Sequence, residues 1–118
     1  MTKVKDLMSR NIVAVSVSTS ADSAMKLMKS MHVTLMPVIS DGKLRGVVFE
    51  RDFGDFNGAE KVSAIMRKPI FVEEDSDHSE AVKKMVDNAV VRIPVVNNKR
   101  DMHCVGIISS TDIVKSVK

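Results

Sequence analysis

GVVFERD at residues 46–52 recurs 60 positions later as GIISSTD at residues 106–112. Each stretch begins with a glycine, continues as a short apolar run typical of a strand, and ends on an aspartate where a helix is expected to begin. The match extends outward, since Val4–Met8 aligns with Val62–Met66. Because self-similarity at a fixed spacing marks an internal repeat, the chain is expected to be one unit written twice.

The predicted order of elements in each copy is β-α-β-β-α. In the first copy, Val13–Val17 alternates apolar and small polar residues, as a half-buried strand does. Ser20 is a candidate N-cap for the amphipathic helix that follows. Asp41-Gly42 is a hairpin turn signal between two further strands. A second helix is expected to start near Glu50.

The second copy predicts the same elements. They are a strand at Ile70–Val72, a helix capped by Ser76 or Asp77, strands at Ile93–Val96 and Cys104–Ile108, and a helix at Thr111–Val117. The fold class expected is therefore α/β (α+β), with unit 1 at residues 1–56, a linker at 57–61 and unit 2 at 62–118. Residues 54–58 between the copies are rich in turn formers. A half of about 60 residues buries little surface alone, so the halves should share a core.

Composition narrows the functional class. The 118 residues carry a formal charge of +3, four Phe, no Tyr and no Trp. Because single-strand nucleic-acid binders use aromatic stacking platforms, nucleic-acid binding ranks low. No apolar run approaches the roughly 18 residues of a membrane span, and the N-terminus has no signal-peptide core, so a cytoplasmic location is expected.

The sequence contains no pattern of residues typical of a catalytic site or a metal site. Cys104 is the only cysteine, so no internal disulfide can form, and a buried hydrophobic role is favoured over a nucleophile. His32, His78 and His103 lack metal-ligand spacing, so no metal site is expected. No triad or paired-carboxylate arrangement is present, and the protein is not expected to be an enzyme or to require a cofactor.

The ordered set of motifs resembles the CBS domain, and its occurrence twice resembles a tandem CBS pair, or Bateman module. The set comprises Val-x-x-hydrophobic-Met, hydrophobic-Pro-Val-hydrophobic, an Asp-Gly or Asn turn, Gly-hydrophobic-hydrophobic, and a closing aspartate. The resemblance implies two β-α-β-β-α units packed sheet to sheet with pseudo-twofold symmetry. It also implies regulatory rather than catalytic function, with adenosine-containing ligands (AMP, ADP, ATP or S-adenosylmethionine) bound in clefts between the units.

Asp112 carries the sharpest site prediction. The resemblance implies that its carboxylate accepts hydrogen bonds from the ribose hydroxyls, which suits an acceptor with two oxygens. Ser109 and Thr111 would add hydroxyls, and the start of the helix would favour phosphate. Arg92 would reach phosphate through its guanidinium fork. A capping box is the alternative for Ser109-x-x-Asp112, and a solvated strand end is the alternative for Arg92.

Three further residues complete the expected main site. The resemblance implies that Thr19 contacts the sugar or base, that Val33 packs on adenine, and that Ile107 lines the same site. Helix capping is the alternative for Thr19, and core packing is the alternative for Val33.

A second, weaker site is expected at Asp52, with Arg51 beside it and with Ser76 and Val90 supplied by the other copy. Phe49 stands where the second copy has Ser109, and Leu35 stands where it has Arg92. The site therefore lacks a hydroxyl and a cation, although Arg51 offers a replacement charge. An asymmetric pair is predicted, in which the Asp52 site is weak, empty or selective for a less charged ligand.

The leading hypothesis is a stand-alone regulatory module that binds an adenine nucleotide and signals to a partner protein in trans. The rival is a structural or protein-interaction module with degenerate clefts, and nucleic-acid binding ranks third. The resemblance also implies a homodimer, for which Val4–Met8 and Val62–Met66 are candidate contacts because their apolar residues look exposed.

Overall fold

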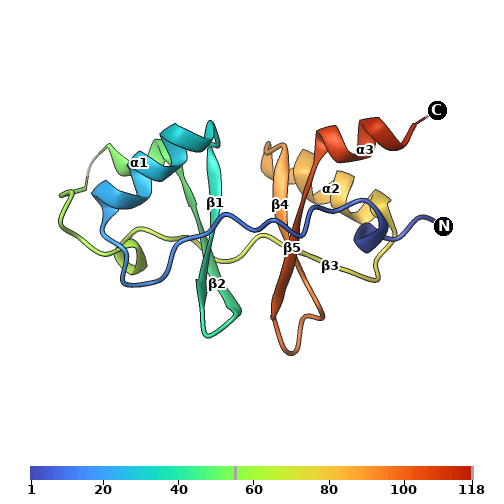
Figure 1. The fold of residues 1–118 in the computed structure, drawn as a ribbon, viewed down its shortest axis with the longest axis horizontal. Helices are drawn as coiled ribbons and strands as arrows, with labels where there is room; N and C mark the ends of the chain where they lie inside the picture. The colour runs from blue at the N-terminus through green and yellow to red at the C-terminus, as the bar shows by residue number, and fades with distance from the viewer. Residues whose placement is uncertain (55, 118) are drawn as a thin grey trace. The chain divides into compact units, whose positions relative to one another are not determined.

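The computed structural model describes residues 1–54 and 56–117. Asp55, which falls in the expected turn-rich stretch, and Lys118 lie outside the described residues. The chain forms two compact units, one of Val13–Pro69 and one of Met1–Ile12 with Ile70–Lys118. Figure 1 shows the mixed α/β architecture, which confirms the predicted fold class.

The Val13–Pro69 unit contains the helix α1 (Ala21–Met31) and an antiparallel pair of strands, β1 (Leu35–Ser40) and β2 (Lys43–Phe49). Ser20 is the N-cap of α1, because its hydroxyl accepts from the Ser23 backbone N–H at 3.2 Å. Asp41 and Gly42 both have positive φ, 54° and 76°, as the tight turn between β1 and β2 requires. The predicted cap and turn are therefore confirmed.

Two predicted elements of this unit are wrong. Val13–Val17 is not a strand: only Val15 pairs, in an isolated parallel bridge with Val38. The chain turns at Ser16 instead, because the Thr19 hydroxyl accepts from the Ser16 backbone N–H at 3.1 Å, and such local bonds compete with strand pairing. The helix expected near Glu50 is only the four-residue 3-10 helix η2 (Glu50–Phe53), which ends at Gly54.

The other unit contains a three-stranded sheet of order β3-β4-β5, built from β3 (Val72–Glu73), β4 (Arg92–Val96) and β5 (Cys104–Ser109). β3 is parallel to β4, and β4 is antiparallel to β5. Its helices are α2 (His78–Asn88) and α3 (Ser110–Ser116). Asp77 is the N-cap of α2, with its carboxylate 3.1 Å from the Ser79 backbone nitrogen. Within the predicted strand Ile70–Val72, only Val72 pairs.

The large apolar side chains at the start of each copy are buried or half-buried rather than exposed. These openings form the short 3-10 helices η1 (Val4–Asp6) and η3 (Val62–Ala64). Val4 is fully buried against the sheet and helices of the Ile70–Lys118 part, and Val62 is fully buried in the Val13–Pro69 unit. The sequence prediction that these segments expose apolar residues is therefore wrong. The compact units are also divided at different places from the repeat, since Met1–Ile12 joins the unit that holds the second copy's sheet.

The recurrent glycines allow close approach of a backbone segment to each hairpin. A Cβ on Gly46 would lie 2.5 Å from the Arg67 carbonyl oxygen, and one on Gly106 would lie 2.7 Å from the Ser9 carbonyl oxygen. No real side chain tolerates such contacts, so both positions need glycine. Next to them, Val47 exchanges two backbone hydrogen bonds with Arg67, and Ile107 exchanges two with Ser9. This pairing positions Arg67 and Ser9 next to the two candidate sites.

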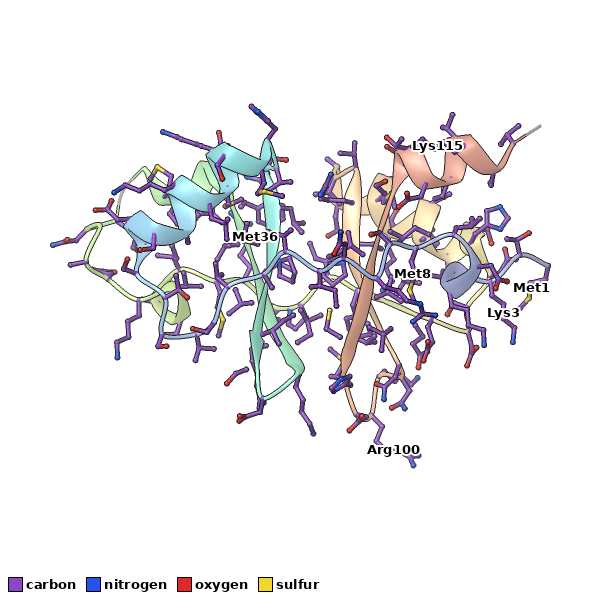
Figure 2. The ribbon with its side chains drawn as sticks, in the orientation of Figure 1. Met1, Lys3, Met8, Met36, Arg100 and Lys115 are labelled. Carbon is purple, nitrogen blue, oxygen red and sulfur yellow. The ribbon has the colours of Figure 1, made fainter. Side chains whose placement is uncertain are left out.

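Hydrophobic cores form within each unit. Met28 and Met36 are almost completely buried in the Val13–Pro69 unit, which fits the role of methionine as a core filler. Figure 2 labels Met36 on β1, and Arg100 at the tip of the loop that joins β4 to β5.

Across residues 1–54 and 56–117, no helix combines the length and apolar character needed to cross a membrane.

Candidate functional site

The junction of β5 and α3 holds the main candidate site. Ser109 ends β5 and is the N-cap of α3. Its hydroxyl accepts from the Asp112 backbone N–H at 3.2 Å, and its own backbone N–H donates to Asp112 Oδ2 at 2.9 Å. These reciprocal bonds form a capping box, so the structural alternative considered for this motif is present.

The capping box leaves part of the carboxylate available. Within the part of the chain that the structure describes, no hydrogen bond or ion pair engages Asp112 Oδ1. Asp112 lies in the first turn of α3 and is only half-buried. An ionised carboxylate oxygen has two lone pairs, so Oδ1 can accept from a ligand hydroxyl while Oδ2 maintains the cap.

The start of α3 offers fewer free donors than expected for phosphate. The Ser110 N–H already donates to the Val91 carbonyl oxygen at 2.8 Å, and the Asp112 N–H donates to Ser109. Only the Thr111 N–H remains among the first three, and α3 has seven residues. Thr111 itself is exposed, so its hydroxyl is accessible. The positive charge needed to bind a phosphate group must therefore come mainly from a side chain.

Arg92 is the side chain placed to supply that charge. It begins β4 and pairs directly with Ser109 across the antiparallel ladder. Directly paired residues have Cβ atoms about 4.5–5.5 Å apart on one face of a sheet, so Arg92 lies beside the capping box. Arg92 is half-buried, and among the described side chains none forms an ion pair with it.

Ile107 lies two residues before Ser109 on β5, so its side chain emerges on the same face of the strand. It is 8% exposed, and its backbone is bonded to Ser9 in both directions. Ile107, Ser109, Thr111, Asp112 and Arg92 thus belong to one unit and gather at one end of its sheet.

Thr19 and Val33 belong to the other compact unit. The Thr19 hydroxyl accepts from the Ser16 backbone N–H and lies 3.1 Å from Ser16 Oγ. Val33 is 7% exposed and packs in the core of its own unit. Both residues therefore have local structural roles, and their predicted contacts with a ligand stay predictions.

The expected second site is organised differently. Asp52 lies in η2, and both of its carboxylate oxygens accept from Arg67: Nε to Oδ2 at 2.7 Å and Nη2 to Oδ1 at 2.7 Å. This bidentate pair holds the pKa of Asp52 below its ordinary value, because hydrogen bonds from the guanidinium favour the ionised carboxylate. The Arg51 guanidinium lies over the Phe49 ring, 4.3 Å from the ring centroid.

Ser76 and Val90 belong to the compact unit that contains Asp112, not to the unit of Asp52. The Ser76 backbone bonds to Glu73 and Val4. Val90 lines a groove of about 310 Å³ between α2 and α3. Their contribution to a ligand at Asp52 also stays a prediction.

Arg67 is the residue that sequence analysis missed. It follows Met66, at the position that corresponds to Ser9 after Met8 in the repeat. That replacement of serine by arginine was visible in the alignment of the copies. The consequence of this difference depends on the backbone pairing of Arg67 with Val47. That pairing places Arg67 beside Asp52, although 15 positions separate the two residues.

Over residues 1–54 and 56–117, no cluster of three or more His, Cys, Asp or Glu side chains is arranged to hold a metal ion. Cys104 is buried, and burial raises the pKa of its thiol, which disfavours the reactive thiolate.

Comparison with known proteins identifies the family. The CBS domain model matches residues 4–53 and 62–118, and the chain therefore belongs to the CBS domain family as a tandem pair. The uncharacterized protein YlbB of Bacillus subtilis is 33% identical over 122 residues, which cover 96% of this chain and 80% of YlbB. An inosine-5′-monophosphate dehydrogenase from Thermoplasma acidophilum is 31% identical over 110 residues, 92% of this chain.

The chain spans 22% of the length of that dehydrogenase and 43% of a Methanocaldococcus jannaschii relative, so the similarity concerns a shared module. Among solved structures, a CBS domain pair/ACT domain protein from Thermotoga maritima matches with a TM-score of 0.87 at 23% identity, covering 98% of this chain and 96% of that one. The structure of CBSX2 in complex with AMP matches with a TM-score of 0.84 at 27% identity, with the same two coverages.

Proposed function

We propose that this CBS pair is a regulatory module that binds an adenosine-containing ligand at Asp112 and signals its presence to a partner protein. The ligand class is AMP, ADP, ATP or S-adenosylmethionine. Two observations on one motif carry the proposal together: Asp112 Oδ1 has no hydrogen-bond or ion-pair partner among the described residues, and Arg92, also without an ion-pair partner among them, pairs with Ser109 across the ladder.

The chemistry of these groups suits a nucleotide. A carboxylate oxygen accepts from the adjacent hydroxyls of a ribose, and a guanidinium binds phosphate oxygens in a fork. The similarity to CBSX2, which was solved with AMP, supports the same ligand class. We propose that the module binds the ligand and catalyses no reaction itself. Its signal to the partner protein depends on the ligand binding one conformation of the module more tightly than another.

Ultraviolet absorbance of the purified protein is the first test. The chain has no Trp and no Tyr, so a bound adenine gives a clear excess near 260 nm. Calorimetric titration of nucleotide-free protein with AMP, ATP and S-adenosylmethionine follows. We expect binding of at least one of them, and no heat change with any at millimolar concentration would refute the proposal.

The rival function is a protein-interaction module without a ligand. Exposed valines on α2 and α3 support an interaction surface, with Val82 40%, Val86 72% and Val114 68% exposed along the groove between these helices. We propose that a second copy of the chain covers this surface, so that the protein is a homodimer. A monomer at micromolar concentration in sedimentation velocity would contradict this.

A further inference from the structure

We propose that Arg67 occupies the carboxylate of Asp52 and thereby closes the first copy's ligand position, so that the pair binds one nucleotide rather than two. This inference rests on the proposed function, since it concerns the equivalent of Asp112 in the other half of the repeat. The two aspartates stand at the same place in the repeat but have different partners.

The contact between Arg67 and Asp52 uses both carboxylate oxygens. The two nitrogen-to-oxygen distances are both 2.7 Å, the geometry of a fork-to-carboxylate pair. The Asp52 side chain is only 17% exposed. A ribose hydroxyl that approached Asp52 would compete with a charged donor already aligned to both oxygens, which a neutral hydroxyl does poorly.

Three further contacts hold Arg67 in place. Its backbone N–H donates to the Val47 carbonyl at 2.8 Å, and its carbonyl accepts from the Val47 N–H at 3.1 Å. Its guanidinium also lies 5.2 Å from the centroid of the Phe49 ring, on which Arg51 packs as well. Phe49 is 4% exposed and therefore provides a fixed surface. The guanidinium thus extends from a hydrogen-bonded backbone and packs on a buried ring.

The other copy shows what the same position does without arginine. Ser9 makes the same two backbone bonds, with Ile107, but its short side chain accepts from the Asn11 N–H at 3.2 Å. Ser109 replaces Phe49 and caps its helix, whereas Phe49 makes no side-chain cap for η2. Asp112 therefore gives one oxygen to the fold and keeps the other available, while Asp52 has both oxygens bound.

The decisive experiment replaces Arg67 with the residue of the other copy. Nucleotide-free wild type and Arg67→Ser are titrated calorimetrically with AMP and, separately, with adenosine, because Leu35 removes the phosphate-binding cation from the first copy. We expect one equivalent bound by wild type and two by Arg67→Ser. The matched control Arg45→Ser removes an exposed guanidinium of β2 that lies outside both candidate sites, and it should bind one equivalent.

Two additional variants locate the gained site. Arg67→Ser with Asp52→Ala should return to one equivalent, and Arg67→Ser with Asp112→Ala should retain one. If Arg67→Ser fails to fold, Arg67→Gln, which cannot form the two-nitrogen fork, serves in its place with the same expectation. Circular dichroism confirms the fold of each variant.

The outcomes separate the two proposals. A wild type that binds nothing refutes the proposed function, while a new equivalent in Arg67→Ser that depends on Asp52 still supports the role of Arg67. A folded Arg67→Ser that gains no equivalent overturns the inference. A wild type that binds two equivalents and loses one in Arg67→Ser also overturns it, because Arg67 would then be a ligand for phosphate.

Discussion

Substitution of Asp112 separates its two roles. Asp112→Ala removes the oxygen that accepts from the Ser109 N–H at 2.9 Å, whereas Asp112→Asn keeps an oxygen there but loses the charge. Loss of a cap lowers the free energy of unfolding by about 0.5–2 kcal/mol. We therefore expect Asp112→Ala to unfold roughly 2–10 °C below wild type in a thermal scan. Asp112→Asn should stay close to wild type.

Both variants should lose nucleotide affinity. A hydrogen bond to a charged group contributes about 1.5–3 kcal/mol. Its loss corresponds to roughly 10–150-fold weaker binding in a calorimetric titration with AMP. Asp41→Asn is the matched control, because Asp41 occupies a tight turn at φ 54° where asparagine is equally suitable. Wild-type affinity in Asp112→Asn would refute the assignment of Asp112, and an unchanged Tm in Asp112→Ala would refute its role in the cap.

Three other predictions concern pH, packing and assembly. The Asp52–Arg67 pair stabilises the fold above the ordinary aspartate pKa and loses that effect as pH falls through the depressed pKa. The difference in urea midpoint between wild type and Arg67→Ser should therefore shrink as the pH is lowered from neutral through that pKa; a constant difference would contradict this. Gly46→Ala should lower the free energy of unfolding by about 1–3 kcal/mol, because its Cβ would lie 2.5 Å from the Arg67 carbonyl oxygen. Gly54→Ala, which has open space at its Cβ, should change it little. Val86→Glu should shift the sedimentation coefficient to that of a monomer, because Val86 is 72% exposed on the groove.

Local chemistry explains which elements the sequence predicted well. Ser20 and the Asp41-Gly42 turn depend on neighbours within a few positions, and the structure confirms both. Val13–Val17 has the alternation of a strand, but the hydroxyls of Ser16 and Thr19 bond locally and end the extended segment. Periodicity alone could not reveal this competition.

Long-range packing explains what the sequence did not predict. Val4 and Val62 look exposed in short apolar segments, yet each is fully buried. The repeat identified Asp52 and Asp112 as equivalent, and it indicated that their neighbours differ. The fork from Arg67 required the backbone pairing with Val47, which no local pattern encodes. The sequence therefore indicated where the candidate sites lie, whereas the contacts of each carboxylate required the folded structure.

The comparison of AMP with 2′-deoxy-AMP tests the central claim most directly. If Asp112 accepts hydrogen bonds from the ribose hydroxyls, removal of one hydroxyl leaves the carboxylate short of a donor, and affinity should fall by roughly tenfold or more in calorimetric titration of the wild type. The same removal should have little effect on any binding that remains in Asp112→Asn. Equal affinity of the wild type for the two nucleotides, or no binding of either at millimolar concentration, would contradict the account.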